Sequence, residues 1–183
     1  AGSMAFPETG IGIYPGLGGM LRMARHVGPA LAKYFTFTGA ALNAADLQAL
    51  GIATRLVAPA EVDAAVQALA AAGRPDKYRA RPIPEKFKPF AQLFEPARVP
   101  ALFAGKVPDG VNAELAGKVA KTLGYKAPLA LRIADEIVDR QAGLPMREAV
   151  EIELGRLKDV FATADAFEGL SSVGRRRPEF KGR

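Results

Sequence analysis

One carboxylate stands directly before a glycine-rich turn near the start of the sequence. Glu8 follows Phe6-Pro7, and glycines then occupy positions 10, 12, 16, 18 and 19. Glycine adopts backbone angles closed to other residues and lets a ligand approach the main chain closely. The first backbone N–H groups of a helix favour an anion or a carbonyl oxygen. The stretch therefore indicates a site for an acyl or phosphate group, with Glu8 as its acid.

Other reactive side chains are scarce. The chain has no cysteine, which excludes disulfides and thiolate chemistry, and its single histidine, His26, excludes a multi-histidine metal site. We expect no metal. His26 lies among basic residues in a predicted helix, where we favour a surface or hydrogen-bonded role over catalysis.

The net charge is +6, and the excess is concentrated in residues 74–88 and 175–183. Basic chains bind nucleic acid, anionic lipid or phosphorylated small molecules. We expect no nucleic-acid partner, because no RNA-binding aromatic motif or helix-turn-helix pattern is present. We expect neither a membrane partner nor a signal peptide, because no apolar run is long enough to cross a bilayer. The cysteine-free composition is compatible with the cytoplasm, where we place the protein.

The elements that must position these residues are mainly helical. Apolar spacing, prolines and capping residues predict helices over residues 17–28, 30–37, 44–50, 59–72, 85–93, 97–104, 112–123, 128–141, 145–161 and 166–171. Residues 74–84 form a surface connection. The strand candidates are residues 4–6 and 52–57. Two strands make no independently stable sheet, so we expect residues 4–6 to pair outside this chain, which would then be part of something larger.

Three groups of residues resemble the enoyl-CoA hydratase/isomerase (crotonase) superfamily. The first resembles the family signature: Phe6-Pro7-Glu8, Gly12, Pro15 to Gly19 and Arg22. The second continues that pattern: Gly28, Thr38-Gly39, Ala44-Ala45-Asp46 and Gly51-Ile52-Ala53. The third resembles the family's closing motif: Asp165, Glu168-Gly169-Leu170, Arg175 to Pro178, Phe180 and Gly182. The length of the stretch between residues 74 and 125 is similar to that of the 3-hydroxyisobutyryl-CoA hydrolase branch.

The resemblance implies the C-terminal part of a crotonase (ClpP/crotonase-like α/β spiral) fold, mainly α with one or two short strands. The family's first half, which carries the oxyanion-hole N–H donors and a first glutamate, is missing. Three segments follow: residues 1–57, the end of the crotonase core with the active-site acid; 58–126, a helical segment with a variable insertion; and 127–183, a C-terminal, trimerisation-type helical segment with a basic tail.

For the site, the resemblance matches Glu8 to the family's second catalytic glutamate, which in hydratases exchanges a proton with the substrate α-carbon. The alternative is a turn or capping acid. Pro15 and Gly16 belong to the substrate-binding turn, and Gly16 stands where the hydrolase branch tends to have an aspartate, which favours a hydratase. Tyr14 and Leu17 either line an acyl pocket or are core residues.

At the other end, Phe180 and Lys181 match tail positions that often contact the adenine and phosphates of coenzyme A. A stacked aromatic ring beside a cation suits an adenine nucleotide. The alternative is a solvated tail.

The resemblance therefore implies the C-terminal segment of an enzyme that hydrates a 2-enoyl-CoA through an oxyanion-stabilised enolate. It implies no cofactor, because coenzyme A is part of the acyl-CoA substrate. The chain alone should be inactive without the missing N-terminal half, and we expect a homotrimer or hexamer. The alternatives are an isomerase, a 3-hydroxyacyl-CoA hydrolase-like enzyme, or a non-catalytic helical assembly or CoA-contacting module. The predicted apolar faces at residues 129–138 and 150–161 suit such assembly.

Overall fold

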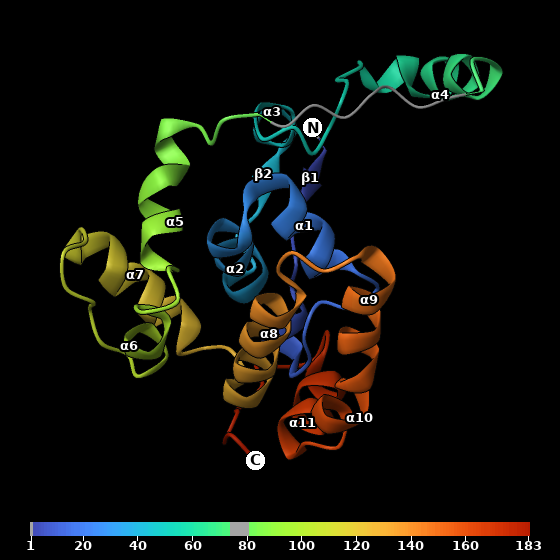
Figure 1. Cartoon of the computed structure of the whole chain (residues 1–183). Helices are drawn as coiled ribbons and strands as arrows, with labels where there is room; N and C mark the ends of the chain where they lie inside the picture. The colour runs from blue at the N-terminus through green and yellow to red at the C-terminus, as the bar shows by residue number, and fades with distance from the viewer. Residues whose placement is uncertain (1, 74–80) are drawn as a thin grey trace.

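The computed structural model describes residues 2–73 and 81–183, which form a predominantly helical body (Figure 1). The two strands are β1 (Ser3–Met4) and β2 (Leu42–Asn43). The single-turn 3₁₀ helices are η1 (Glu8–Ile11), η2 (Pro59–Glu61) and η3 (Glu85–Phe87). The α-helices are α1 (Gly19–Val27), α2 (Pro29–Thr38), α3 (Ala44–Ala49), α4 (Val62–Ala71), α5 (Lys88–Leu93), α6 (Val99–Phe103), α7 (Ala113–Leu123), α8 (Pro128–Gln141), α9 (Met146–Gly155), α10 (Leu157–Phe161) and α11 (Ala164–Ser172). The expected fold class, mainly α with short strands, is confirmed.

The strands form one small antiparallel ribbon. Ser3 pairs with Asn43 and Met4 pairs with Leu42. The expectation that the first strand finds its partner outside this chain is therefore wrong. The predicted strand at residues 52–57 is also wrong: the segment runs without regular structure, and Leu56 and Val57 at its end are exposed. Its β-branched composition suits a strand, but a strand also needs a neighbour whose backbone completes the ladder.

The larger core lies where α8 packs against α2 and α10 (Figure 1). Helix α8 has the predicted bounds, and its apolar face is buried through Ile133, Ile137 and Val138. This face therefore serves the core of its own chain, where Phe37 of α2 and Phe94 also lie. The alternative role of this face, in assembly, does not fit its burial within the chain. Pro128 at the helix start explains the sharp boundary, because proline fits the first turn without needing a donor.

A second core holds the N-terminal segment in place. Phe6, Met23, Leu31, Phe35 and Leu42 belong to it, so β1, α1, α2 and β2 share one apolar interior. Helix α3 follows directly and is capped as predicted, because the side-chain oxygen of its N-cap residue accepts the Asp46 N–H at 2.9 Å. The segment that leads to Glu8 is thereby held by the core contacts of Phe6 and by the pairing of β1 with β2.

A buried ion-pair cluster joins α2 to α8. The Nζ of Lys33 lies 2.6 Å from Oδ1 of Asp135 and 2.6 Å from Oδ1 of Asp139, and the Lys33 side chain is only 1 % exposed. A lysine is rarely buried so completely unless it is paired. The cluster therefore fixes the pairing of these two helices.

The predicted helix over residues 145–161 is two helices that meet at Arg156, namely α9 and α10. The apolar side predicted for it is also wrong in part, because Leu154 and Phe161 are exposed. The buried positions are Ala149, Glu153 and Val160. These three positions keep the spacing of one helical face on both sides of Arg156, and that face lies one residue before the face through Leu154 and Phe161.

The helix predicted over residues 59–72 is present as η2 and α4. Helix α4 projects away from the body (Figure 1), and its Val62 and Val66 side chains are exposed. The predicted surface connection over residues 74–84 falls mainly on residues 74–80, which lie outside the described part of the chain. No helix among the described residues has the length and apolar character needed to cross a membrane.

Candidate active site

Glu8 opens a 3₁₀ turn that ends in a glycine. Pro7 precedes the turn, and Gly12 ends it with φ 88°, in the left-handed region where glycine carries no penalty. The Gly12 N–H donates to the Glu8 carbonyl, and the Ile13 N–H donates to the same oxygen at 3.2 Å. These bonds fix the backbone of Glu8.

The Glu8 side chain is half-buried, and its Oε2 atom is buried with no hydrogen-bond partner among the described residues. Burial raises the pKa of this carboxyl above its ordinary value of 4.5, and a backbone hydrogen bond at Glu8 itself opposes the change. A carboxyl whose pKa moves towards neutrality can both give and accept a proton. An uncommitted oxygen on such a group suits acid–base chemistry better than capping.

Buried hydrogen bonds seat this turn on two helices. The Thr9 hydroxyl donates to the carbonyl of Phe37 at the end of α2, at 2.9 Å. The Ala127 N–H, just before α8, donates to the Thr9 carbonyl at 2.9 Å. The hydroxyl and the carbonyl of Thr9 are therefore both held by hydrogen bonds, which fixes the chain directly after Glu8.

Close backbone packing seats the same turn on α11. A methyl group at Gly12 would lie 2.7 Å from the Cα of Ala166, and closer still to the carbonyl oxygen of Asp165. A methyl group at Gly169 would lie 2.8 Å from the Gly12 nitrogen, and closer still to the carbonyl group of Ile11. Only glycine fits at either position without a shift of the main chain.

A cation also lies beside the turn. A methyl group at Gly10 would lie 3.4 Å from the Nζ of Lys126, and one at Gly39 would lie 3.3 Å from the same atom. Burial lowers the pKa of Lys126. Lys126 carries no signal in the sequence that would select it, because its approach to η1 depends on contacts between segments far apart in the chain.

The glycine-rich turn of residues 14–19, called the 14–19 turn below, has an exposed tip. Leu17 is 96 % exposed and has φ 57°, a left-handed conformation that is unfavourable for leucine. Of the two roles predicted for Leu17, a core position does not fit this exposure. Pro15 is buried and Gly16 is half-buried.

Two backbone N–H groups at the start of α1, those of Gly18 and Gly19, have partners within the chain. The Gly18 N–H donates to Oε1 of Glu153 at 2.8 Å, and the Gly19 N–H donates to the Gly16 carbonyl at 3.0 Å. The anionic group that accepts from the Gly18 N–H is therefore the carboxylate of a residue on α9. Sequence reasoning missed Glu153, although helical spacing groups it with the apolar positions Ala149 and Ile152.

Tyr14 is a core residue that supports the turn. Its side chain is 2 % exposed, and its hydroxyl donates to the Glu153 carbonyl at 2.6 Å. Burial is the main reason that the pKa of Tyr14 rises to about 12. The negative charges of Glu153 and Asp159 add to this effect, and Arg156 opposes it. Of its two predicted roles, the core position fits.

The C-terminal tail folds back onto α11 instead of extending into solvent. The N–H groups of Lys181 and Gly182 donate to the two carboxylate oxygens of Asp165, at 2.7 and 2.8 Å. Phe180 is half-buried against the larger core, whereas Lys181 is exposed. A solvated position therefore does not fit Phe180, whereas the Lys181 side chain is solvent-exposed. Asp165 connects the tail to η1, because its carbonyl oxygen packs against Gly12.

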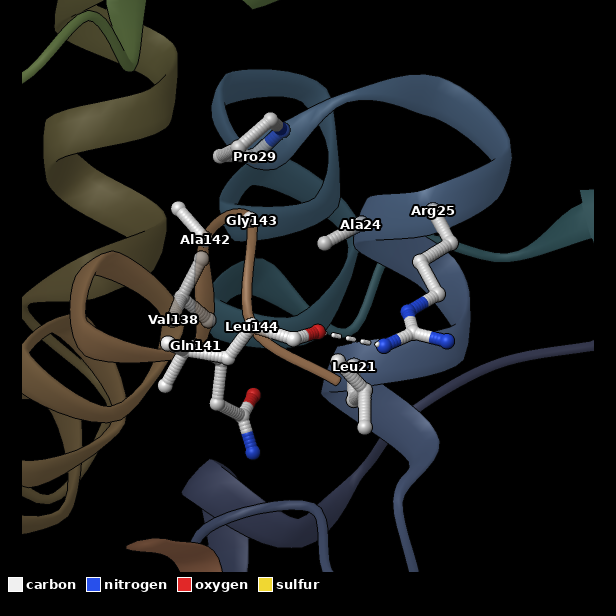
Figure 2. Close-up of a pocket in the computed structure, with 9 residues that line it drawn as sticks. All are labelled: Leu21, Ala24, Arg25, Pro29, Val138, Gln141, Ala142, Gly143 and Leu144. Atoms are coloured by element: carbon white, nitrogen blue, oxygen red, sulfur yellow. Dashed lines mark hydrogen bonds between the residues drawn. The ribbon is translucent and has the colours of Figure 1, made fainter. Parts of the chain in front are cut away.

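A hollow of about 360 Å³ opens elsewhere, between α1 and the end of α8. Figure 2 shows its lining, including the hydrogen bond of 2.9 Å from the Arg25 guanidinium to the Leu144 carbonyl. The residues predicted for the site are not among those that line it. Glu8 and the 14–19 turn are linked by chain continuity and rest on different helices, η1 on α2 and α11 and the turn on α9. The hollow of Figure 2 is a separate feature.

Solved structures with the same fold come from enzymes that act on acyl-CoA according to their names. An enoyl-CoA hydratase from Rhodobacter sphaeroides 2.4.1 superposes with a TM-score of 0.75 at 25 % identity, covering 98 % of this chain and 55 % of that one. A carnitinyl-CoA dehydratase from Mycobacterium thermoresistibile superposes with a TM-score of 0.72 at 25 % identity, covering 97 % and 54 %. The fold is that of the crotonase superfamily, as the resemblance implied.

The family model for enoyl-CoA hydratase/isomerase matches residues 2–181, and the chain belongs to this family. Among curated proteins, a probable enoyl-CoA hydratase from Rhizobium meliloti (strain 1021) is 26 % identical over 97 % of this chain and 50 % of its own length. The mitochondrial 3-hydroxyisobutyryl-CoA hydrolase of Xenopus laevis is 27 % identical over 92 % of this chain and 48 % of its own length. The chain spans about half the length of these curated relatives.

Proposed function

We propose that this chain is the C-terminal part of an enzyme that hydrates a 2-enoyl-CoA. Glu8 acts as the acid or base at the α-carbon of the thioester. The observation that carries this proposal is the half-buried Glu8 carboxyl, with its raised pKa and uncommitted Oε2, a few residues before an exposed glycine-rich turn in the sequence. The substrate class follows from family membership.

The chemistry requires two contributions. In hydration, the oxygen of water bonds to the β-carbon while the electrons of the C=C bond move onto the thioester oxygen and give an enolate. The water loses one proton to a base in the remaining half of the fold, and a proton delivered to the α-carbon then consumes the enolate and completes the product. Glu8 moves that proton. Backbone N–H donors must stabilise the charge that develops on the thioester oxygen, and in this proposal they come from the remaining half of the fold. The 14–19 turn, including Pro15 and Gly16, lies beside the acyl group, and Phe180 and Lys181 lie near the nucleotide of coenzyme A.

A hydrolase is the second candidate, because a 3-hydroxyisobutyryl-CoA hydrolase is similar along nearly the whole chain. Gly16 argues against it, because the hydrolase branch tends to have an aspartate there. A CoA-release assay separates the two reactions. Hydration consumes the conjugated double bond of an enoyl-CoA and leaves the thioester intact, whereas hydrolysis liberates a free thiol.

Assembly into a trimer or hexamer is part of the proposal and has a specific surface to test. Phe161, Phe167, Leu170 and Val173, on or directly after α10 and α11, are all exposed. Large apolar groups gathered on one part of a surface commonly mark contact sites. Light scattering combined with acyl-CoA calorimetry separates an enzyme from a non-catalytic module, because the module would assemble without binding acyl-CoA. The cytoplasmic location stays a prediction.

The decisive experiment compares three proteins in a crotonyl-CoA hydration assay. They are the 183-residue chain, the same chain joined to the N-terminal half of its fold, and the joined protein carrying Glu8→Gln. We expect turnover only in the second, with the Gln variant slower by roughly 10²–10⁴-fold, the usual contribution of a positioned general acid or base. Glu151→Gln, an exposed position on α9, is the matched control. Full activity in the isolated chain or in the Glu8 variant would refute the proposal.

A further inference from the structure

We propose that Glu153 is a positioning residue that holds the 14–19 turn in the conformation that presents Leu17 to the acyl chain of the substrate. The inference rests on the proposed function insofar as the turn receives an acyl group. The geometry itself is independent of that function.

Glu153 bonds two positions of the turn at once. Its Oε1 accepts the Gly18 N–H at 2.8 Å, and its backbone carbonyl accepts the Tyr14 hydroxyl at 2.6 Å. The two residues of the first contact lie 135 positions apart in the sequence, and those of the second lie 139 positions apart. A methyl group at Gly16 would lie 4.0 Å from the same Oε1. The carboxylate therefore lies behind the turn, and the tip at Leu17 points away from the protein.

The tip needs such a support because its conformation is unfavourable. Leu17 has φ 57° and exposes 96 % of its surface, which combines a strained backbone with a solvated apolar side chain. Two further bonds restrain it: Arg22 Nη1 donates to the Leu17 carbonyl at 2.6 Å, and the Gly19 N–H donates to the Gly16 carbonyl. Strained residues persist only where the surroundings fix them, and they cluster at ligand-binding sites.

General packing does not explain a glutamate at this position. Glu153 is 1 % exposed, and its Oε2 is buried with no hydrogen-bond partner among the residues described. A buried carboxylate with an unsatisfied oxygen is costly compared with an apolar side chain of similar size. The specific gain that offsets this cost is the charge-assisted bond to the Gly18 N–H, which is roughly twice as strong as a neutral one.

Amide hydrogen exchange measured by NMR on the 183-residue chain tests the role directly. The variants are Glu153→Ala, which removes the acceptor, and Glu153→Gln, whose side-chain carbonyl can still accept. Glu151→Ala is the control, because Glu151 is exposed on the same helix and pairs only with Arg147 among the described residues. The Gly18 amide reports the turn, and the Ile137 amide, in the core of α8, reports global opening.

We expect Glu153→Ala to accelerate exchange at Gly18 by about 10- to 100-fold more than at Ile137, as the loss of one charge-assisted bond predicts. Glu153→Gln should restore most of the protection, and Glu151→Ala should change neither amide. Equal acceleration at both amides would show a purely structural residue and overturn the proposal. Unchanged exchange at Gly18 would overturn it as well.

The second readout is turnover by the chain joined to the rest of its fold. We expect Glu153→Ala to lower kcat/KM for enoyl-CoAs with long acyl chains more than for crotonyl-CoA, because the proposal assigns Leu17 to the far end of the acyl chain. Equal losses for both substrates would contradict the role assigned to Leu17. If the unmodified protein turns over no acyl-CoA, the proposed function fails. The exchange data would then still decide whether Glu153 holds the turn.

Discussion

Gly12 and Gly169 bring two backbones into direct contact, one in the turn after Glu8 and the other in helix α11. A methyl group on either glycine would overlap main-chain atoms of the other segment. Neither clash can be relieved by a rotating side chain, because the atoms met are backbone atoms. The location of the candidate acid therefore depends on two residues that lie at opposite ends of the sequence.

The first prediction concerns this contact. Gly169→Ala should destabilise the chain by about 3 kcal/mol or more, since overpacking against a rigid backbone exceeds the usual cost of an added methyl group. Gly117→Ala is the matched control, because Gly117 also lies inside a helix but has open space around it. The control should stabilise the chain by up to about 1 kcal/mol. Urea unfolding measures both, and equal stability of the two variants would contradict the packing.

The second prediction concerns the pH dependence of stability at Glu8. Burial raises the pKa of this carboxyl above 4.5, so the folded state binds its proton more tightly than the unfolded state does. Ionisation of Glu8 therefore lowers the free energy of unfolding as the pH rises from about 4.5 through the raised pKa. Glu8→Gln should match wild type at pH 4 and become the more stable protein by pH 7. Thermal melts at both values measure the difference, and a constant difference would argue against the raised pKa.

The third prediction concerns the buried lysine between α2 and α8. Lys33→Met should cost about 3 kcal/mol, because it leaves Asp135 and Asp139 without their shared cation. Lys118→Met, which breaks an exposed pair with Glu114, should cost at most about 0.5 kcal/mol. Chemical denaturation gives both values. A Lys33 variant as stable as the Lys118 variant would show that the cluster is not needed for the helix pairing.

The fourth prediction concerns acid release of the tail. Hydrogen bonds from Arg176 and from the Glu179 N–H lower the pKa of Glu168 from 4.5 to about 2. Since this pKa is lowered on folding, the stabilisation is complete above pH 4.5 and is lost as the pH falls towards 2. The Glu179 amide resonance should move through this range, while the Ile137 amide should not. A midpoint for Glu179 near pH 4.5 would mean that Glu168 does not hold the tail.

Local signals predicted the helices well. Asn43 caps α3 as expected, and Pro128 begins α8 at the expected residue. Such signals act within a few residues, so a sequence displays them directly. The predicted strand at residues 52–57 failed because strand formation depends on a neighbour that local composition does not specify.

The candidate site was only partly predictable for the same reason. The type of residue and the turn that follows it single out Glu8. Glu153 and the neighbouring Glu151 are chemically identical, and only the helical phase places one of them inside. The strain at Leu17 is not visible in the sequence either, because it arises from bonds to Arg22 and from the support behind Gly18.

The contact between Gly12 and Gly169 also sets the order in which the site can form during synthesis. A ribosome makes the segment that carries Glu8 well before it makes α11, the helix on which that segment rests. The nascent chain therefore carries its acid without the surface that seats it until α11 has been made. A chain that stops before residue 165 would still contain Glu8, but it would lack the surface that orients the carboxylate.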